Sequence, residues 1–443
     1  MSGSIMNSFP ITKPLLAAGL LLAAYTAFGS AATAAQPPAK VPDRMAWFTD
    51  ARFGLFIHWG PVSLQGTEIG WSRGGERRGR KGNKTGAVPV EVYDNLYHHF
   101  NPTNFNARQW VSIAKAAGMK YVVFTTRHHD GFSMFDSQVS DYKITLSPFG
   151  RDVVKELADA CHRAHLPLGF YYSPPDWHHP DYRTNTHSRY LEYLHAQVRE
   201  LSTRYGRVDI FWWDGLRGKA EDWDTDNLFK MIRQYQPRVL LNNRAGVPAD
   251  FDTPEQRIGK FQNTRPWESC ITLCQQWAWK PDDQMKSLKE CVRTLVSCAG
   301  GDGNLLLNVG PMPDGRIEPR QVERLQEMGA WLKQNGASIY GTRGGPFKPG
   351  AWGASTCRSK YLYLHVFTWP AESLRLPLTG KQVKSSKVLT GGKAVIKQTA
   401  NGITIRVEEK DRQGIDTIIR LKLDSSAEDI PPLEIEDGAR DRT

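Results

Sequence analysis

Between about residue 50 and residue 345, short apolar runs alternate with longer amphipathic segments. The runs are rich in β-branched and aromatic residues and predict strands, whereas the segments between them have helical spacing. Trp110, Ile113, Ala114 and Ala117, for example, would share one helix face. This order predicts parallel strands joined by helical crossovers. Strands are expected at residues 53–57, 120–126, 167–173, 208–213, 238–241 and 304–309, with a weaker one at 259–262.

About seven strands over roughly 300 residues favour an α/β fold of the (β/α)8-like, TIM-type barrel class over an open sheet. In such barrels the chemistry lies at the C-terminal ends of the strands. Beyond residue 345 the runs become short and alternating, with Gly and Asn between them, and predict an antiparallel β-sandwich. We therefore expect a catalytic barrel over residues 36–345, a β-sandwich over 346–425 and a disordered tail over 426–443.

The first 35 residues have the pattern of a secretory signal peptide. A weakly positive start precedes an apolar stretch, which is too short for a membrane span, and a small-residue end follows it. We therefore expect an exported protein, periplasmic or secreted. Export would allow the six cysteines to pair, although their spacing predicts neither a pairing nor a zinc site. Residues 270–274 are expected to form a loop or short helix.

The formal net charge of +11 is compatible with a nucleic-acid, acidic-surface or acidic-glycan partner. Basic and acidic residues are interspersed along most of the chain, and no nucleic-acid-binding motif accompanies the charge. We therefore expect no nucleic-acid and no membrane partner. The nearest approach to a basic run is the Gly-rich segment 73–84, which predicts a loop near the barrel mouth.

One predicted strand runs directly into a carboxylate and a glycine. Alternation places Ile210, Trp212 and Asp214 on one face, so Asp214 continues the inner face beyond the strand end. Such an aspartate suits nucleophilic attack or charge stabilisation. The alternative is a helix N-cap or a salt-bridged structural acid.

Other predicted strand ends carry histidine, tyrosine or arginine. His128 and His129 precede a glycine, which allows both to face one ligand; the alternative is one solvent-facing and one core histidine. A metal site is not expected, because no carboxylate–histidine spacing completes one. His58, Tyr171 and Arg244 follow or end further strands. Together these residues suggest a sugar pocket, in which aromatic rings meet the apolar sugar face and polar groups bind hydroxyls.

A glycosidase needs a second carboxyl group to protonate the leaving oxygen. Glu255 and Glu268 follow Arg244 and are candidates for this acid/base, while Glu68, after the first strand, could bind hydroxyls. Each could equally be a surface glutamate.

Nine motifs in the same order carry a family resemblance. They are FGLFIHWG, TEIGWSR, YVVFTTRHHDGFSMFDS, GFYYS, DIFWWDG, NNR, DFDTPEQ, WESC and GNLLLNVGPMPDG. Over residues 43–345 the chain resembles the α-L-fucosidases of glycoside hydrolase family 29. The resemblance implies a retaining exo-hydrolase that removes terminal α-L-fucose from fucosylated glycans by double displacement, without a metal or other cofactor.

The resemblance also implies roles for individual residues. Asp214 matches the nucleophile, and Glu268 is favoured over Glu255 as the acid/base. The positions expected to bind fucose are His58, His128, His129, Tyr171 and Arg244, with Glu68 and Trp71 as further pocket residues. Candidates for an aromatic wall against the fucose methyl group are Trp59, Trp71, Trp212 and Trp277. The alternatives are a non-catalytic fucose-binding protein and a glycosidase of other sugar specificity on the same scaffold.

Overall fold

The computed structural model describes residues 43–80, 85–370, 372–377 and 379–435. The signal peptide expected at residues 1–35 and the last eight residues of the expected tail lie outside this range. Among the helices of the described residues, none combines the length and the apolar character needed to cross a membrane.

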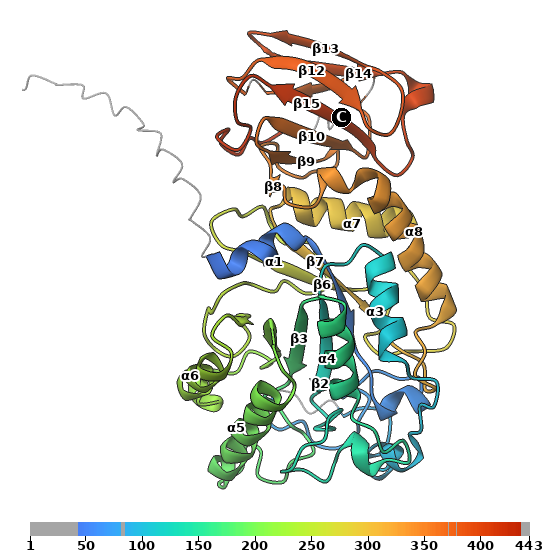
Figure 1. Ribbon diagram of the computed structural model, residues 1–443, viewed down its shortest axis with the longest axis vertical. Coiled ribbons are helices and arrows are strands. Elements are labelled where there is room, and N and C mark those ends of the chain that lie inside the picture. The colour runs from blue at the N-terminus through green and yellow to red at the C-terminus, as the bar shows by residue number, and fades with distance from the viewer. Residues whose placement is uncertain (1–42, 81–84, 371, 378, 436–443) are drawn as a thin grey trace, which may run out of the picture. The chain divides into compact units, whose positions relative to one another are not determined.

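A parallel sheet of seven strands, in the order β5-β4-β3-β2-β1-β7-β6, forms the centre of the fold (Figure 1). Two isolated parallel bridges, Asn242–Phe251 and Asp252–Trp267, lead from the β5 side to the β6 side, so the sheet curls into a TIM-type barrel as expected. The strands are β1 (Phe53–Ile57), β2 (Val122–Arg127), β3 (Leu168–Tyr172), β4 (Ile210–Trp213), β5 (Leu240–Leu241), β6 (Glu268–Thr272) and β7 (Asn304–Val309).

Two expectations for this sheet are wrong. The weak strand expected at residues 259–262 is a loop of half-exposed and exposed residues, and the buried Phe251 supplies the bridge at that place in the barrel. Residues 270–274 were expected to form a loop or short helix, yet Glu268–Thr272 is strand β6. Glu268, Ser269 and Thr272 are polar but buried, so β6 lacks the apolar run that identified the other strands.

Amphipathic helices cover the outer face of the strands. Trp110 and Ala114 of α3, for example, belong to the same buried cluster as Val122 and Phe124 of β2. Side chains of Asn106, Asp152 and Ser287 cap the N-termini of α3, α4 and α7 by accepting backbone N–H hydrogen bonds. The helices are α1 (Ala46–Ala51), α2 (Val90–Tyr93), α3 (Ala107–Ala116), α4 (Val153–Arg163), α5 (His187–Arg204), α6 (Thr225–Tyr235), α7 (Leu288–Gly300) and α8 (Pro319–Asn335).

The inner face of the barrel has a separate buried cluster, which includes Phe56, Val123, Tyr171, Trp212 and Leu306. These residues alternate along their strands with residues of the outer cluster. The next inward-facing side chain, just beyond the C-terminal end of each strand, therefore points into the mouth of the barrel. This is where the expected site residues should meet.

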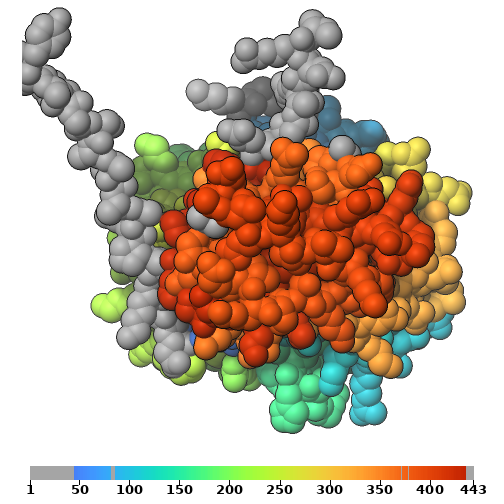
Figure 2. Space-filling view, turned by 90° about the horizontal axis from the view of Figure 1, so that it is seen from above, coloured from blue at the N-terminus to red at the C-terminus, as the bar shows by residue number. Residues whose placement is uncertain are grey.

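The C-terminal region is an antiparallel β-sandwich, as expected. Its sheets have the orders β12-β15-β10-β9-β8 and β11-β14-β13, and they share one core that includes Leu364, Ile405 and Ile419. Figure 2 views the surface of these C-terminal strands, coloured orange to red. The strands are β8 (Arg343–Gly344), β9 (Gly353–Arg358), β10 (Tyr361–Val366), β11 (Leu374–Leu376), β12 (Val383–Val388), β13 (Ala394–Thr399), β14 (Gly402–Val407) and β15 (Thr417–Leu423).

Residues 426–435 differ from the disordered tail that was expected. Ala427 and Ile430 are buried, and the Leu433 N–H donates to Pro346 O at 2.7 Å. These apolar side chains complete the sandwich core, which the acidic composition of the segment obscures. The domain boundaries themselves stay a prediction.

Candidate active site

A cavity of about 1100 Å³ opens at the C-terminal ends of the barrel strands. Polar, charged and aromatic side chains line it together, which is the composition that hydroxylated ligands require. The expected site residues that line it are His58, Trp71, His128, Tyr171, Trp212, Asp214, Arg244, Glu255 and Trp277.

Asp214 lies at the centre of this group, directly after β4. Its side chain is 15% exposed and continues the inner face of Ile210 and Trp212, as alternation predicts. The Tyr171 hydroxyl donates to Asp214 Oδ2 at 2.9 Å, and Arg244 Nη1 donates to Oδ1 at 3.3 Å. Asp214 caps no helix, so the N-cap alternative does not apply to it.

The charges around Asp214 keep its carboxylate ionised. Burial alone would raise the pKa of Asp214, but the close His129 imidazole and the Arg244 guanidinium outweigh burial and hold that pKa well below its ordinary value. A nucleophilic carboxylate has to stay ionised while a partner carboxyl carries the proton. Asp214 meets the first requirement.

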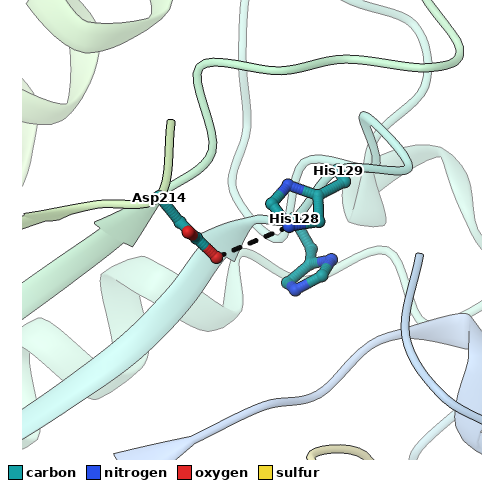
Figure 3. A group of neighbouring side chains, drawn as sticks. All are labelled: His128, His129 and Asp214. Carbon is teal, nitrogen blue, oxygen red and sulfur yellow. Dashed lines mark ion pairs between the residues drawn. The ribbon is translucent and has the colours of Figure 1, made fainter. Parts of the chain in front are cut away.

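A bulge in β2 explains how two adjacent histidines reach one site. The register of β2 against β3 shifts between Thr125 and Arg127, so Arg127 packs on the outer side against Tyr172 and His128 points inward. His128 stacks on Tyr171, with ring centroids 5.4 Å apart. His129 Nε2 lies 3.4 Å from Asp214 Oδ2, and Figure 3 shows the carboxylate turned toward the two rings. Both imidazole rings therefore lie near Asp214, and both are buried.

The hydrogen bonds of His129 indicate which ring nitrogen carries a proton. Its Nδ1 lies 2.6 Å from Ser173 Oγ, and that hydroxyl gives its own hydrogen to Pro175 O. Ser173 must therefore accept from Nδ1–H. The second nitrogen, Nε2, faces the Asp214 carboxylate, with Oδ2 at 3.4 Å.

His58 also carries a proton on Nδ1, and this ring stays neutral. Asn308 donates its amide hydrogen to Trp277 O, so its oxygen accepts from His58 Nδ1–H at 2.7 Å. Burial lowers the pKa of His58 to about 3. The other ring nitrogen, Nε2, therefore presents a lone pair to the cavity and can accept a hydrogen bond from a ligand hydroxyl.

Arg244 joins the two carboxylates of the cavity. Its Nη1 also donates to Glu255 Oε2 at 2.7 Å, so the two acceptor oxygens of Asp214 and Glu255 are at most about 6 Å apart. Retaining glycosidases hold their two carboxyl groups roughly 5–5.5 Å apart. Glu255 is half-exposed, which gives it the solvent access that a proton-shuttling group needs.

Arg244 is held by residues outside the set expected from the sequence. Its Nε donates to Thr253 Oγ1 at 2.8 Å, and that hydroxyl donates to Asn243 Oδ1 at 3.0 Å. The guanidinium also lies over the Trp212 ring, 4.7 Å from its centroid. Thr253 lies two residues before Glu255, and no pattern in the sequence distinguishes it.

Glu268 does not lie in the cavity, although it was favoured as the acid/base. It is the first residue of β6, and Cys270, one inward-facing position further along, is the one that lines the cavity. Glu268 therefore lies about 6–7 Å deeper in the barrel. It is fully buried and accepts hydrogen bonds from the Tyr121 hydroxyl and from Trp212 Nε1, the latter at 3.0 Å. Burial raises its pKa to about 7, but Glu268 is not among the residues that line the cavity.

Glu68 and Trp59 are also not part of the cavity lining. The Glu68 carboxylate accepts from the backbone N–H groups of Trp277 and Ala278, so it fixes the segment that carries Trp277. Trp59 belongs to the outer core and donates its Nε1–H to Met312 O at 3.1 Å. It follows His58 in an extended segment and points the opposite way.

Three tryptophans supply the aromatic walls. Trp71 meets His129 edge to face with centroids 5.5 Å apart, and Trp277 lies 4.8 Å from the His58 ring. Trp212 stacks on Tyr171 at 5.6 Å. These rings enclose the space beside Asp214 in the way that apolar sugar faces require.

His128, His129 and Asp214 bring three potential metal-ligand atoms within 4.8 Å of one another. The site disfavours a dication, because the Arg244 guanidinium already places a positive charge beside the Asp214 carboxylate. Both oxygens of the Asp214 carboxylate thus already accept hydrogen bonds from the protein itself.

Comparisons with known proteins agree with this geometry. The family model described as alpha-L-fucosidase matches residues 27–337. Human plasma alpha-L-fucosidase is 31% identical over 357 residues, which cover 73% of this chain and 76% of that protein.

Solved structures extend the similarity to the fold. Alpha-L-fucosidase isoenzyme 1 from Paenibacillus thiaminolyticus superposes with a TM-score of 0.77 and 36% identity, covering 86% of this chain and 99% of that one. A family 29 alpha-L-fucosidase from Bacteroides thetaiotaomicron, solved as a trapped covalent intermediate, has a TM-score of 0.77 and 27% identity over 88% of this chain and 98% of that one.

Proposed function

The chain belongs to the α-L-fucosidase family, glycoside hydrolase family 29, and we propose that it removes terminal α-L-fucose from glycans with Asp214 as nucleophile and Glu255 as acid/base. One observation carries the assignment of the two roles. Asp214 and Glu255 accept hydrogen bonds from the same guanidinium nitrogen of Arg244 at the cavity wall, whereas Glu268 is fully buried in the barrel interior.

In the first step the Asp214 carboxylate attacks C1 of the fucosyl residue, and the C1–O bond to the leaving group breaks. Glu255 gives its proton to the departing oxygen, so the aglycone leaves as an alcohol. This forms a covalent fucosyl ester on Asp214. In the second step Glu255 removes a proton from water, the water oxygen attacks C1, and Asp214 leaves as a carboxylate. Two inversions at C1 give net retention.

The remaining polar residues are assigned to binding and charge. Neutral His58 accepts a hydrogen bond from a sugar hydroxyl through Nε2, and the His128 ring, which also lines the cavity, is assigned to a second hydroxyl. Tyr171 and His129 hold Asp214 in its ionised form and fix its orientation. Trp71, Trp212 and Trp277 are expected to contact the apolar face and methyl group of fucose.

Hydrolysis of a panel of 4-nitrophenyl glycosides tests this function. We expect release from the α-L-fucoside alone, with the α-anomer of free fucose appearing first in proton NMR spectra. Initial appearance of the β-anomer would contradict the double displacement. Binding of fucose without release from either aryl or natural fucosides would instead indicate a non-catalytic fucose-binding protein, and release from another glycoside a different specificity.

We further propose that the protein acts outside the cytoplasm. The signal-peptide pattern of residues 1–35 supports this, and so does the similarity to a plasma protein. Fractionation of cells that express the full chain, with N-terminal sequencing of the product, is the direct test. Full-length protein in the cytoplasmic fraction would contradict export.

A further inference from the structure

A second cavity, of about 390 Å³, adjoins the first. Both cavities are lined by Gly79 and Arg80 from one loop and by Leu216, Arg217 and Gly218 from another. A sugar bound beside Asp214 would thus have the second cavity next to it. The shared wall is where the part of a glycan that follows the terminal fucose would lie.

The charges of this shared wall are unbalanced. In the second cavity Asp222 pairs with Arg183 at 2.6 Å and Glu221 with Lys219 at 3.4 Å, and in the first Arg244 pairs with both Asp214 and Glu255. Every carboxylate that lines either cavity therefore already has a cation. Arg80 and Arg217 have no carboxylate partner among the residues that the structure describes, and both side chains are exposed.

Arg80 is held in place by an aromatic ring. Its guanidinium lies 4.8 Å from the centroid of Trp71, and Trp71 in turn meets His129, the neighbour of Asp214. A guanidinium stacked on a ring keeps its edge free for hydrogen bonds to a planar or tetrahedral anion. Arg80 thus presents donors close to the catalytic pocket.

Arg217 is placed by the loop that follows the nucleophile. Leu216 and Arg217 have φ angles of +48° and +64°, and this left-handed backbone is unfavourable for residues other than glycine. The loop is anchored by the Gly215 N–H, which donates to Arg244 O at 3.0 Å. Strain of this kind persists where the surrounding structure enforces it, and it gathers at functional sites.

We propose that Arg80 and Arg217 form a subsite for an anionic group, a sulfate ester or a carboxylate, on the sugar that carries the fucose. This inference rests on the proposed fucosidase function and names its preferred substrate class: fucosylated glycans with acidic neighbouring sugars. Two guanidinium groups without competing carboxylates bind such oxyanions through charge-assisted, bidentate hydrogen bonds. Neutral fucosides remain substrates, but they lack the additional hydrogen bonds to Arg80 and Arg217.

The test compares matched fucosylated oligosaccharides whose fucose-bearing sugar is neutral, sulfated or a uronic acid. We expect kcat/KM to be roughly tenfold higher for at least one anionic form at low salt, and this preference to shrink in 0.5 M NaCl. Arg80→Gln and Arg217→Gln should each lower the ratio of anionic to neutral kcat/KM several-fold. A larger effect with the sulfated form would identify a sulfate subsite, and a larger effect with the uronic acid a carboxylate subsite.

Arg375→Gln is the matched control, because it removes the same charge from an exposed position on β11 of the sandwich. Its ratio should equal that of the wild type. Equal kcat/KM for neutral and anionic substrates in an enzyme that cleaves 4-nitrophenyl α-L-fucoside would overturn the subsite and leave the proposed function intact. Equal loss of the preference in all three variants would also overturn the subsite, because the net positive charge of the protein would then explain the preference for anionic substrates.

Discussion

At Asp214, burial and charge act in opposite directions. A buried carboxyl without partners would take up a proton at neutral pH, but Tyr171, His129 and Arg244 all contact this one. Their combined effect keeps the pKa of Asp214 well below its ordinary value. The carboxylate is therefore ionised and oriented before a ligand arrives. Arg244, one of the three residues that hold it, also donates to Glu255.

Azide distinguishes the two carboxylates by the product that it gives. Asp214→Ala should lose at least about a thousandfold in kcat, and azide should rescue it with inverted configuration at C1. Glu255→Ala should lose less on 4-nitrophenyl fucoside than on a natural fucoside, and azide should give the retained product. Product NMR reads both outcomes. If Glu268→Ala, rather than Glu255→Ala, gave the retained azide, the assignment of Glu255 would be wrong.

Arg244→Gln should move the acidic limb of the pH profile. Arg244 helps to lower the pKa of Asp214, so its removal raises that pKa toward the ordinary value. Asp214 acts ionised, so kcat/KM should then begin to fall at a higher pH than in the wild type as the solution is acidified. Measurement of kcat/KM between pH 3 and 7 checks this shift. An acidic limb at the same pH in both proteins would exclude Asp214 as its source.

At the scale of elements, the bulge in β2 and the depth of β6 decide which residues meet the ligand. The bulge turns His128 inward, and β6 begins deep enough that Cys270, not Glu268, reaches the cavity. Glu268 instead accepts hydrogen bonds from both Tyr121 and Trp212. The Arg244 guanidinium lies over the Trp212 ring. This is a structural role for a residue whose raised pKa resembles that of a catalytic acid.

Glu268→Gln should change how the stability depends on pH. Burial raises the pKa of Glu268 to about 7 from its ordinary value of 4.5, so the folded state holds a proton that the unfolded chain releases. Its contribution is fully present below the unfolded pKa and is lost as pH rises toward 7. The free energy of unfolding of the wild type should therefore fall by roughly 3 kcal/mol relative to the variant between pH 4.5 and 7.5.

Urea denaturation of both proteins at several pH values measures this difference. Glu192→Gln is a suitable control, because it removes a carboxyl group from an exposed position on α5, outside the barrel interior. A difference between wild type and Glu268→Gln that does not change with pH would mean that the pKa of Glu268 is the same in the folded and unfolded protein.

At the scale of the whole molecule, most of the barrel could be predicted from apolar runs and helical spacing. Asp214 could be placed too, because strand alternation is local and the apolar face of β4 is unmistakable. The position of Glu268 could not be predicted in the same way. Its strand is polar, and whether a residue lies at the floor or the mouth of a barrel depends on where the strand begins.

Glu255 shows a second limit of prediction from sequence. It lies in an irregular segment, 245–267, whose path is fixed by distant contacts such as the bridge from Glu255 to Cys270. Glu68 and Trp59 were expected in the pocket but do not line it. The Glu68 carboxylate accepts hydrogen bonds from backbone N–H groups, and the Trp59 side chain points from an extended segment into the outer core. Local pattern identifies such residues, but only the folded chain says which way they point.

The most direct test of the central claim is to trap the covalent intermediate. The protein would be incubated with 2-fluoro-fucosyl fluoride, digested and analysed by mass spectrometry. We predict one fluorofucosyl adduct, on the peptide that contains Asp214, with loss of activity in proportion to labelling and no adduct in Asp214→Ala. An adduct on another residue, or an adduct that still forms on Asp214→Ala, would contradict the assignment of Asp214 as the nucleophile.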